Sequence, residues 1–243
     1  MKIVYDVVNT ILFHEPSIPI LYSMILKKNG YQVSPEKIKK IRNDVMVQNH
    51  TYPPNCCCKY SENYYNNKWN DLVAQILIKA DVNEGKVRKI AREIHFTINN
   101  DNVNLIIEPS FFSTIDSIKK SNSLGILSNG YPSVKKWLAS LNIQNYFDFA
   151  LLSSEIGHQK PCPLAFSRAH AERVLYDGIS VYVGDDYYED GIGAIYGGFD
   201  AAIIVSPDNN IDKFNYYVEN KKVFYTPNLK FLPDILKEVY KRV

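Results

Sequence analysis

Residues 3–12 read IVYDVVNTIL, a short apolar run that ends in Asp6 and passes into a turn at Asn9 and Thr10. A strand of a parallel sheet typically ends in this way, with a polar side chain at the edge where such sheets bind ligands. The position two residues after Asp6, where a partner acid is expected, is Val8. Asp6 is therefore either a nucleophile that has lost its proton shuttle or an acid at the end of a strand.

Other short apolar runs follow along the chain, and helix-compatible segments separate them. The expected strands are Ile3–Asp6, Leu124–Leu127, Phe149–Leu152, Ser180–Val183 and Ala202–Val205. The expected helices between them are Phe111–Lys120, Ser133–Leu141, Leu164–Val174 and Asp190–Tyr196. Strands rich in valine, isoleucine and leucine that alternate with helices predict an α/β fold, a doubly wound parallel sheet covered on both faces.

The interval between the first two strands is much longer than one crossover requires, and most of it has helical periodicity. Four apolar stripes recur in it, and Ser34-Pro35-Glu36 is typical of the start of a helix. We therefore expect a core domain of residues 1–14 and 103–243 and an inserted helical cap domain of residues 15–102.

Composition narrows the class of protein. The chain has 243 residues, of which 46% are hydrophobic and 22% charged, and its formal net charge is +2. These values are ordinary for a globular protein and do not favour nucleic acid or membrane surfaces as partners. Because no stretch resembles a signal peptide or a spanning helix, we expect a cytoplasmic protein. The run Cys56–Cys58 lacks the spacing of a metal site and is more typical of apolar packing. The sequence contains no signal for an oligomeric state.

The ends of the expected strands carry groups suited to displacement at phosphorus. A carboxylate such as Asp6 can attack and form an acyl phosphate. A divalent cation prefers hard oxygen ligands such as Asp185 and Asp190, while a Ser128 hydroxyl and a Lys160 ammonium can neutralise oxygens of the transferring group. Together they predict a site for a small phosphorylated molecule.

These residues lie in a pattern that resembles the haloacid dehalogenase-like superfamily with a helical cap. Its first motif, D-x-D-G-T, is matched by residues 6–10, DVVNT, and its second by Ser128 in GILSNG. Its third, G-x-x-K-P-x-P, is matched by residues 157–163, GHQKPCP, and its fourth by residues 183–194, VGDDYYEDGIGA. Any one motif is weak, but all of them in order are specific.

The resemblance implies an Mg²⁺-dependent phosphatase that acts through an aspartyl-phosphate on Asp6. It implies catalytic roles for Asp6, Ser128 and Lys160, and substrate contacts from Asn129 and Thr10. The metal ligands would be Asp6, the Val8 carbonyl and Asp185, with Asp190 supporting through water.

Val8 departs from the family pattern, because the second aspartate of family phosphatases protonates the leaving group. Losing such a group typically costs about 10²–10⁴-fold in rate, which predicts a slow or leaving-group-restricted phosphatase. Three alternatives stay open: a weakly active or inactive phosphate- or partner-binding protein; a 2-haloacid dehalogenase, although these usually carry tyrosine at this position and lack the Gly-Asp pair; and a phosphonatase-like enzyme using Lys27 or Lys28. The opening stretch is also similar to a branch named after a rhythmically expressed insect protein.

Overall fold

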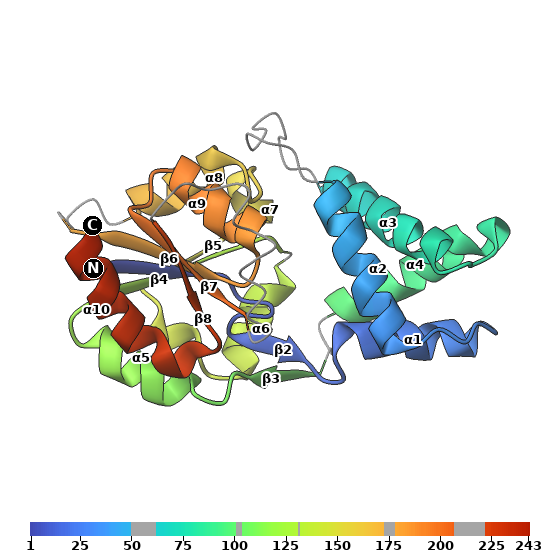
Figure 1. The fold of residues 1–243 in the computed structure, drawn as a ribbon, viewed down its shortest axis with the longest axis horizontal. Coiled ribbons are helices and arrows are strands. Elements are labelled where there is room, and N and C mark those ends of the chain that lie inside the picture. Colours follow the sequence, from blue (N-terminus) through green and yellow to red (C-terminus); the bar gives the residue numbers. More distant parts are fainter. Residues whose placement is uncertain (50–61, 101–103, 131, 173–177, 207–221) are drawn as a thin grey trace. The chain divides into compact units, whose positions relative to one another are not determined.

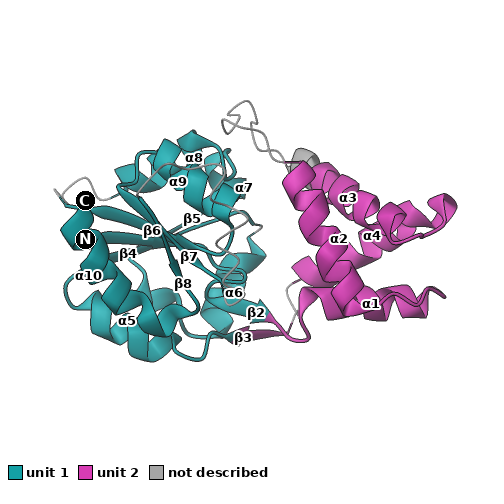
Figure 2. Ribbon diagram, viewed as in Figure 1, with its two compact units in different colours: residues 1–13, 53–60, 107–243 teal, residues 14–52, 61–106 magenta. Residues whose placement is uncertain are grey.

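The computed structural model describes residues 1–49, 62–100, 104–130, 132–172, 178–206 and 222–243. The chain divides into two compact units, coloured separately in Figure 2. Unit 1 takes in the described residues of 1–13 and 107–243, and unit 2 those of 14–52 and 61–106. The expected division into a core domain of residues 1–14 and 103–243 and an inserted cap domain of residues 15–102 stays a prediction. The Cys56–Cys58 run lies outside the described residues.

Unit 1 is built on a six-stranded parallel sheet in the order β5-β4-β1-β6-β7-β8 (Figure 1). The strands are β1 (Lys2–Tyr5), β4 (Ser123–Ser128), β5 (Phe149–Leu152), β6 (Ser180–Gly184), β7 (Ala201–Val205) and β8 (Val223–Thr226). The predicted doubly wound α/β class is confirmed, and five of these strands coincide with expected ones to within a residue or two. Sequence analysis missed β8.

Burial separates central strands from edge strands. Every residue of β1, β4, β6 and β7 is buried, whereas β5 and β8, at the two ends of the strand order, are buried only in part. This is why the central strands are almost wholly apolar, as strands covered on both faces must be. In the register, Tyr5 pairs with both Ile126 and Val183, so β1, β4 and β6 end at the same edge of the sheet.

Helices cover both faces of the sheet (Figure 1). On one face lie α5 (Phe111–Lys119) and α10 (Leu232–Arg242), and on the other lie α8 (Pro163–Ala171) and α9 (Gly193–Tyr196). Two further helices of this unit are α6 (Ser133–Ser140) and α7 (Ser153–Ile156), and 3-10 turns lie at Gln144–Tyr146 and Leu229–Phe231. The helix expected over Asp190–Tyr196 is instead a π-helical turn, Tyr187–Ile192, followed by α9.

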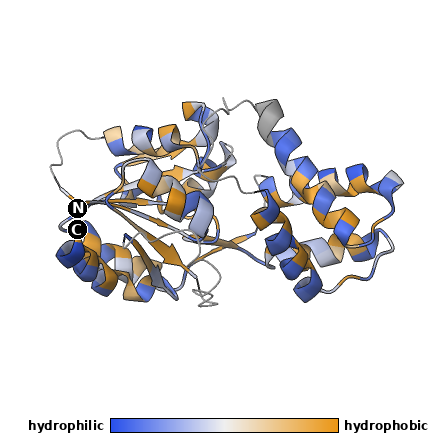
Figure 3. Ribbon diagram, turned by 45° about the horizontal axis from the view of Figure 1, so that its top comes forward, coloured by the Kyte–Doolittle hydropathy of each residue, from blue (hydrophilic) through white to orange (hydrophobic). Residues whose placement is uncertain are grey.

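The helices of unit 2 in the described part of the chain are α1 (Ile18–Lys28), α2 (Pro35–Gln48), α3 (Glu62–Lys79) and α4 (Glu84–Asn99). Each carries both apolar and polar residues (Figure 3), as expected for helices that bury one face. The hydroxyl of Ser34 accepts a hydrogen bond from the Lys37 N–H at 3.2 Å, which caps α2 at the predicted start. Gly30 follows α1 with φ +89°, a left-handed conformation that favours glycine.

A two-stranded ribbon of β2 (Leu12–His14) and β3 (Leu105–Ile107) connects the units along the chain. The sequence did not predict it, because three-residue strands are too short to show a pattern. Among the helices in the described part of the chain, none has the length and apolarity to cross a membrane.

Candidate active site

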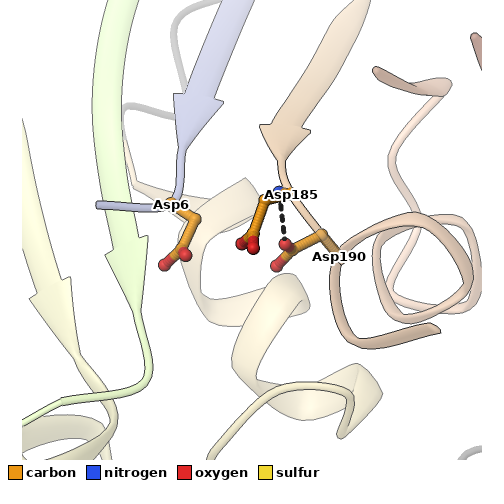
Figure 4. A group of neighbouring side chains, drawn as sticks. All are labelled: Asp6, Asp185 and Asp190. Carbon is orange, nitrogen blue, oxygen red and sulfur yellow. Dashed lines mark hydrogen bonds between the residues drawn. The ribbon is translucent and has the colours of Figure 1, made fainter. Parts of the chain in front are cut away.

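The shared edge of β1, β4 and β6 brings the predicted acidic residues together. Asp6 follows β1 directly, Ser128 is the last residue of β4, and Asp185 follows β6. Asp6 is held there by a hydrogen bond from its N–H to the Val183 carbonyl at 2.8 Å. Figure 4 shows the carboxylates of Asp6, Asp185 and Asp190 turned toward a common space beyond the strand ends.

Lys160 is the positive charge of this cluster. It lies in the loop before α8, and its side chain is 2% exposed. Its Nζ is 2.9 Å from Asp6 Oδ1 and 2.6 Å from Asp190 Oδ1, and it lies 5.4 Å from the centroid of the Tyr182 ring. Burial alone would lower the pKa of Lys160, but the carboxylates of Asp190 and Asp6 outweigh it and raise that pKa well above its usual value. The two carboxylates therefore favour the ammonium form of Lys160.

Asp190 organises the loop after β6. Its Oδ1 pairs with Lys160, while its Oδ2 accepts hydrogen bonds from the N–H groups of Asp185 and Asp186, both at 3.0 Å. This close approach requires glycine at position 184, because a Cβ there would lie 2.2 Å from Asp190 Oδ2. Asp190 thus fixes the backbone that presents the Asp185 carboxylate.

The π-helical turn that carries Asp190 is capped by Asp186. Its Oδ1 accepts hydrogen bonds from the N–H groups of Tyr188 and Glu189 at 2.8 and 2.7 Å. π-Helical turns are rare and occur frequently at functional sites. The cap and Asp190 together hold this loop at the edge of the sheet.

The donor set fits a divalent cation. Asp6, Asp185 and Asp190 each offer a carboxylate oxygen, and these oxygens all lie within 4.8 Å of one another. Lys160 alone among the neighbouring groups described above offsets these negative charges, so a cation would relieve the remaining repulsion. Hard carboxylate oxygens are the ligands that Mg²⁺ prefers.

The pKa values of two of these carboxyls reflect the same crowding. Burial, followed by the charges of Asp190 and Asp6, raises the pKa of Asp185 well above its usual value. Burial also raises the pKa of Asp190, to about 6, even though the Lys160 ammonium acts to lower it. A bound cation would reverse this effect by favouring the charged forms.

The remaining predicted site residues are Ser128, at the end of β4, and Val8 and Thr10, in the segment between β1 and β2. Val8 is half-buried and lies two residues after Asp6. The Ser128 side chain is buried at the end of β4. Thr10 is fully buried, and within the described part of the chain its hydroxyl has no hydrogen-bond partner. The roles assigned to these residues stay predictions.

Asn129 has partners that the sequence did not suggest. Its Oδ1 accepts a hydrogen bond from the Lys160 N–H at 2.7 Å, and its Nδ2 donates to the Lys160 carbonyl at 2.9 Å and to Glu189 Oε2 at 3.3 Å. Sequence analysis also missed Tyr182, whose hydroxyl donates to the Leu127 carbonyl at 2.7 Å while its ring faces Lys160. The resemblance implied a substrate contact for Asn129, whereas no signal in the sequence pointed to Tyr182.

Comparison with known proteins supports the resemblance. The sequence profile of the haloacid dehalogenase-like hydrolases matches residues 34–204, a segment that includes Ser128, Lys160, Asp185 and Asp190 but begins after Asp6. The chain is 35% identical over 101 residues to a glyceraldehyde 3-phosphate phosphatase from Methanothermobacter thermautotrophicus, a match covering 40% of this chain and 44% of that protein. The chain spans about half the length of the curated relatives it matches.

Solved structures share the fold. A HAD-hydrolase, YfnB, from Bacillus subtilis, bound to magnesium, superposes with a TM-score of 0.67 at 15% identity over 97% of this chain and 98% of that one. A 2-haloacid dehalogenase from Pseudomonas syringae superposes with a TM-score of 0.57 at 22% identity over 98% of this chain and 99% of that one. At these identities the likeness concerns the fold and does not decide between phosphorus and carbon–halogen chemistry.

Proposed function

This chain belongs to the family of haloacid dehalogenase-like hydrolases, and we propose that it is an Mg²⁺-dependent phosphatase acting on a small phosphorylated molecule. The observation that carries the proposal is the buried Lys160 ammonium, which lies between Asp6 and Asp190. The carboxylate of Asp185 belongs to the same cluster of acidic oxygens. An ammonium beside a candidate nucleophile and an acidic cation site is the arrangement that phosphoryl transfer requires.

In the proposed reaction, Asp6 attacks the phosphorus of the substrate. An Asp6 oxygen forms the new bond to phosphorus while the bond from phosphorus to the leaving oxygen breaks, and the leaving oxygen departs with the electron pair. Water then attacks the aspartyl-phosphate, which releases inorganic phosphate and restores the carboxylate. The Lys160 ammonium and the Ser128 hydroxyl stabilise the negative oxygens of the transferring group. When bound, Mg²⁺ would supply further neutralisation of the phosphoryl charge from Asp6, the Val8 carbonyl and Asp185.

Val8 determines which substrates react well. Its side chain cannot donate a proton, so the leaving oxygen departs unprotonated or takes its proton from water. Phosphates with weakly basic leaving groups, such as aryl and acyl phosphates, therefore react faster than alkyl phosphates. The chain's relative acts on glyceraldehyde 3-phosphate according to its name, and this triose phosphate is accordingly the first alkyl phosphate to test.

The first experiment measures release of inorganic phosphate from p-nitrophenyl phosphate, acetyl phosphate and glyceraldehyde 3-phosphate, with Mg²⁺ and with EDTA. We expect Mg²⁺-dependent turnover of the first two, and its loss in Asp6→Asn, which keeps the shape of the side chain but removes the nucleophile. Metal-independent turnover, or full activity in Asp6→Asn, would contradict the proposal.

The role assigned to Val8 is tested by Val8→Asp, with Val8→Asn as the matched control that cannot transfer a proton. We expect Val8→Asp to accelerate hydrolysis of glyceraldehyde 3-phosphate by about 10²–10⁴-fold and that of p-nitrophenyl phosphate much less. Equal acceleration of both substrates, or acceleration by Val8→Asn, would show that proton transfer is not what Val8 limits.

The same assays separate two alternatives. A phosphate-binding protein would bind phosphate with Mg²⁺ but turn over nothing until Val8→Asp is introduced. A 2-haloacid dehalogenase, which the absence of the second aspartate favours, would release halide without metal. The oxygen cluster of Asp6, Asp185 and Asp190 favours the metal-dependent phosphatase.

A further inference from the structure

Asn129 forms a bridge between three separate segments of the sheet edge. It follows β4, its amide contacts both backbone polar groups of Lys160, and it reaches Glu189 in the π-helical turn. The two hydrogen bonds to Lys160, at 2.7 and 2.9 Å, fix the position and the orientation of that residue's backbone.

The donors of the Asn129 amide are fully used by these contacts. A side-chain amide has two N–H donors; one serves the Lys160 carbonyl and the other serves Glu189 Oε2. A substrate oxygen could receive a hydrogen bond from Asn129 only by displacing one of them. The geometry therefore favours a role inside the protein over the substrate contact expected from the sequence.

Glu189 sets the orientation of the amide. If the amide were flipped, Oδ1 would face the Glu189 carboxylate and the Lys160 carbonyl, and Nδ2 would face the Lys160 N–H. All of those contacts would be repulsive, so the arrangement with Nδ2 toward Glu189 is the stable one. Glu189 is itself held by its N–H, which donates to the Asp186 carboxylate at 2.7 Å.

We propose that Asn129 is a positioning residue that clamps the Lys160 backbone so that the Lys160 ammonium stays between Asp6 and Asp190. The ammonium is 2.9 and 2.6 Å from these partners, and a fixed backbone spares the flexible side chain from adjusting to keep both contacts. The effect of this clamp on catalysis rests on the proposed function, in which Lys160 stabilises the phosphoryl group. The existence of the clamp does not depend on that function.

The first test follows the clamp without turnover. In Asn129→Ala, the Lys160 N–H loses its acceptor, and we expect its hydrogen exchange, measured by NMR, to accelerate by at least about tenfold. Asn122→Ala is the matched control, because Asn122 is also half-buried and donates to a backbone carbonyl, that of Ile118 at 2.6 Å, away from Lys160. Unchanged exchange at Lys160 in Asn129→Ala would overturn the proposal, whether or not the protein is a phosphatase.

The second test separates positioning from substrate contact. We expect Asn129→Ala to lower kcat for p-nitrophenyl phosphate and acetyl phosphate by the same factor, about 10², with little change in KM. A loss that appears mainly in KM, or that differs between the two substrates, would indicate substrate contact and overturn the proposal. A wild-type protein without turnover would contradict the proposed function, and the exchange measurement would then decide the clamp by itself.

The third test uses rescue. In Asn129→Asp, one oxygen still accepts from the Lys160 N–H, but the other faces the Lys160 carbonyl and the Glu189 carboxylate. We expect slow exchange at Lys160 to be lost in this variant and partly restored when Glu189→Gln is added, because the new amide donates to the carboxylate introduced at position 129. Absence of any rescue by Glu189→Gln would show that Glu189 does not support the clamp and would overturn that part of the proposal.

Discussion

The interiors of the two units differ in what they bury. In unit 1, the edge of the sheet buries charged groups: Lys160 is 2% exposed, Asp190 1% and Asp6 7%. In unit 2, the buried cluster is apolar, with members such as Leu26, Ile38 and Leu77. Burying charge is costly unless partners compensate it, whereas apolar burial directly stabilises a fold. The contrast places the buried charged cluster in unit 1, while the buried cluster described in unit 2 is apolar.

The largest effect should follow from removing the cation of unit 1. Lys160→Met leaves the facing carboxylates without their ammonium, so we expect the free energy of unfolding to fall by about 3–5 kcal/mol. Mg²⁺ should restore part of this loss, because a cation can replace the missing charge. Urea unfolding with Mg²⁺ and with EDTA measures both effects, and an Mg²⁺-independent loss would argue against a cation site beside Lys160.

The next effect concerns packing in unit 2. Leu77→Ala removes a fully buried side chain, and we expect a loss of about 2–5 kcal/mol. Its neighbour Ile78 is 52% exposed, so Ile78→Ala should cost well under 1 kcal/mol. The chain has two tryptophans, Trp69 in unit 2 and Trp137 in unit 1, whose fluorescence follows each unit separately after the other is changed to phenylalanine. If Leu77→Ala and Ile78→Ala lowered the free energy of unfolding equally, unit 2 would lack a specific core.

A smaller effect is expected from one methyl group beside Asp190. The Cβ of Gly184→Ala would lie 2.2 Å from Asp190 Oδ2, so Asp190 must move, at a cost of about 1–3 kcal/mol and with weaker Mg²⁺ binding. Gly191→Ala is the control in the same loop, because its Cβ would meet only side-chain atoms and at longer distances, Ile204 at 3.3 Å and Tyr187 at 3.6 Å. Calorimetry of Mg²⁺ binding compares the two variants, and equal affinities would contradict the role given to Asp190.

The smallest effect concerns pH. Burial lowers the pKa of His14 and of His95, both in unit 2, from the ordinary value of 6.5. The unfolded chain therefore binds protons more readily than the folded one, so the contribution of these histidines to stability is complete above pH 6.5 and declines as the pH falls below it. Unfolding followed by Trp69 should show this decline, and a double variant with His14→Gln and His95→Gln should reduce it. An unchanged slope in the double variant would assign the pH dependence to other groups.

Much of the fold followed from the sequence because its central strands are buried on both faces. Continuous runs such as Ile203-Ile204-Val205 leave little room for another assignment. Elements with a weak sequence pattern were not predicted. β8 is an edge strand with mixed burial, and the π-helical turn Tyr187–Ile192 has no hydrophobic period by which to recognise it. Tertiary contacts, which the sequence does not display, decide these elements.

For the candidate site, residue types were predictable and partners were not. The motifs pointed to Asp6, Lys160 and Asp185; the sheet register brings Asp6 and Asp185 to one edge, and the ion pairs of Lys160 with Asp6 and Asp190 place it there too. Nothing in the sequence indicated that the Asn129 amide would bond to the backbone of a residue 31 positions later. Such contacts depend on loop conformations that form only when the strands have paired.

The ribbon of β2 and β3 allows the chain to change one of its parts without changing the other. The segment between these strands begins and ends at hydrogen-bonded neighbours, where the Glu15 N–H donates to the Asn104 carbonyl at 3.0 Å. A different helical segment grafted between the same two residues would start and finish at the same points, leaving the sheet edge with its acidic cluster undisturbed. The pairing of β2 with β3 thus gives the helical segment a fixed start and a fixed end, so changes of length or sequence within it leave from and return to the same backbone positions.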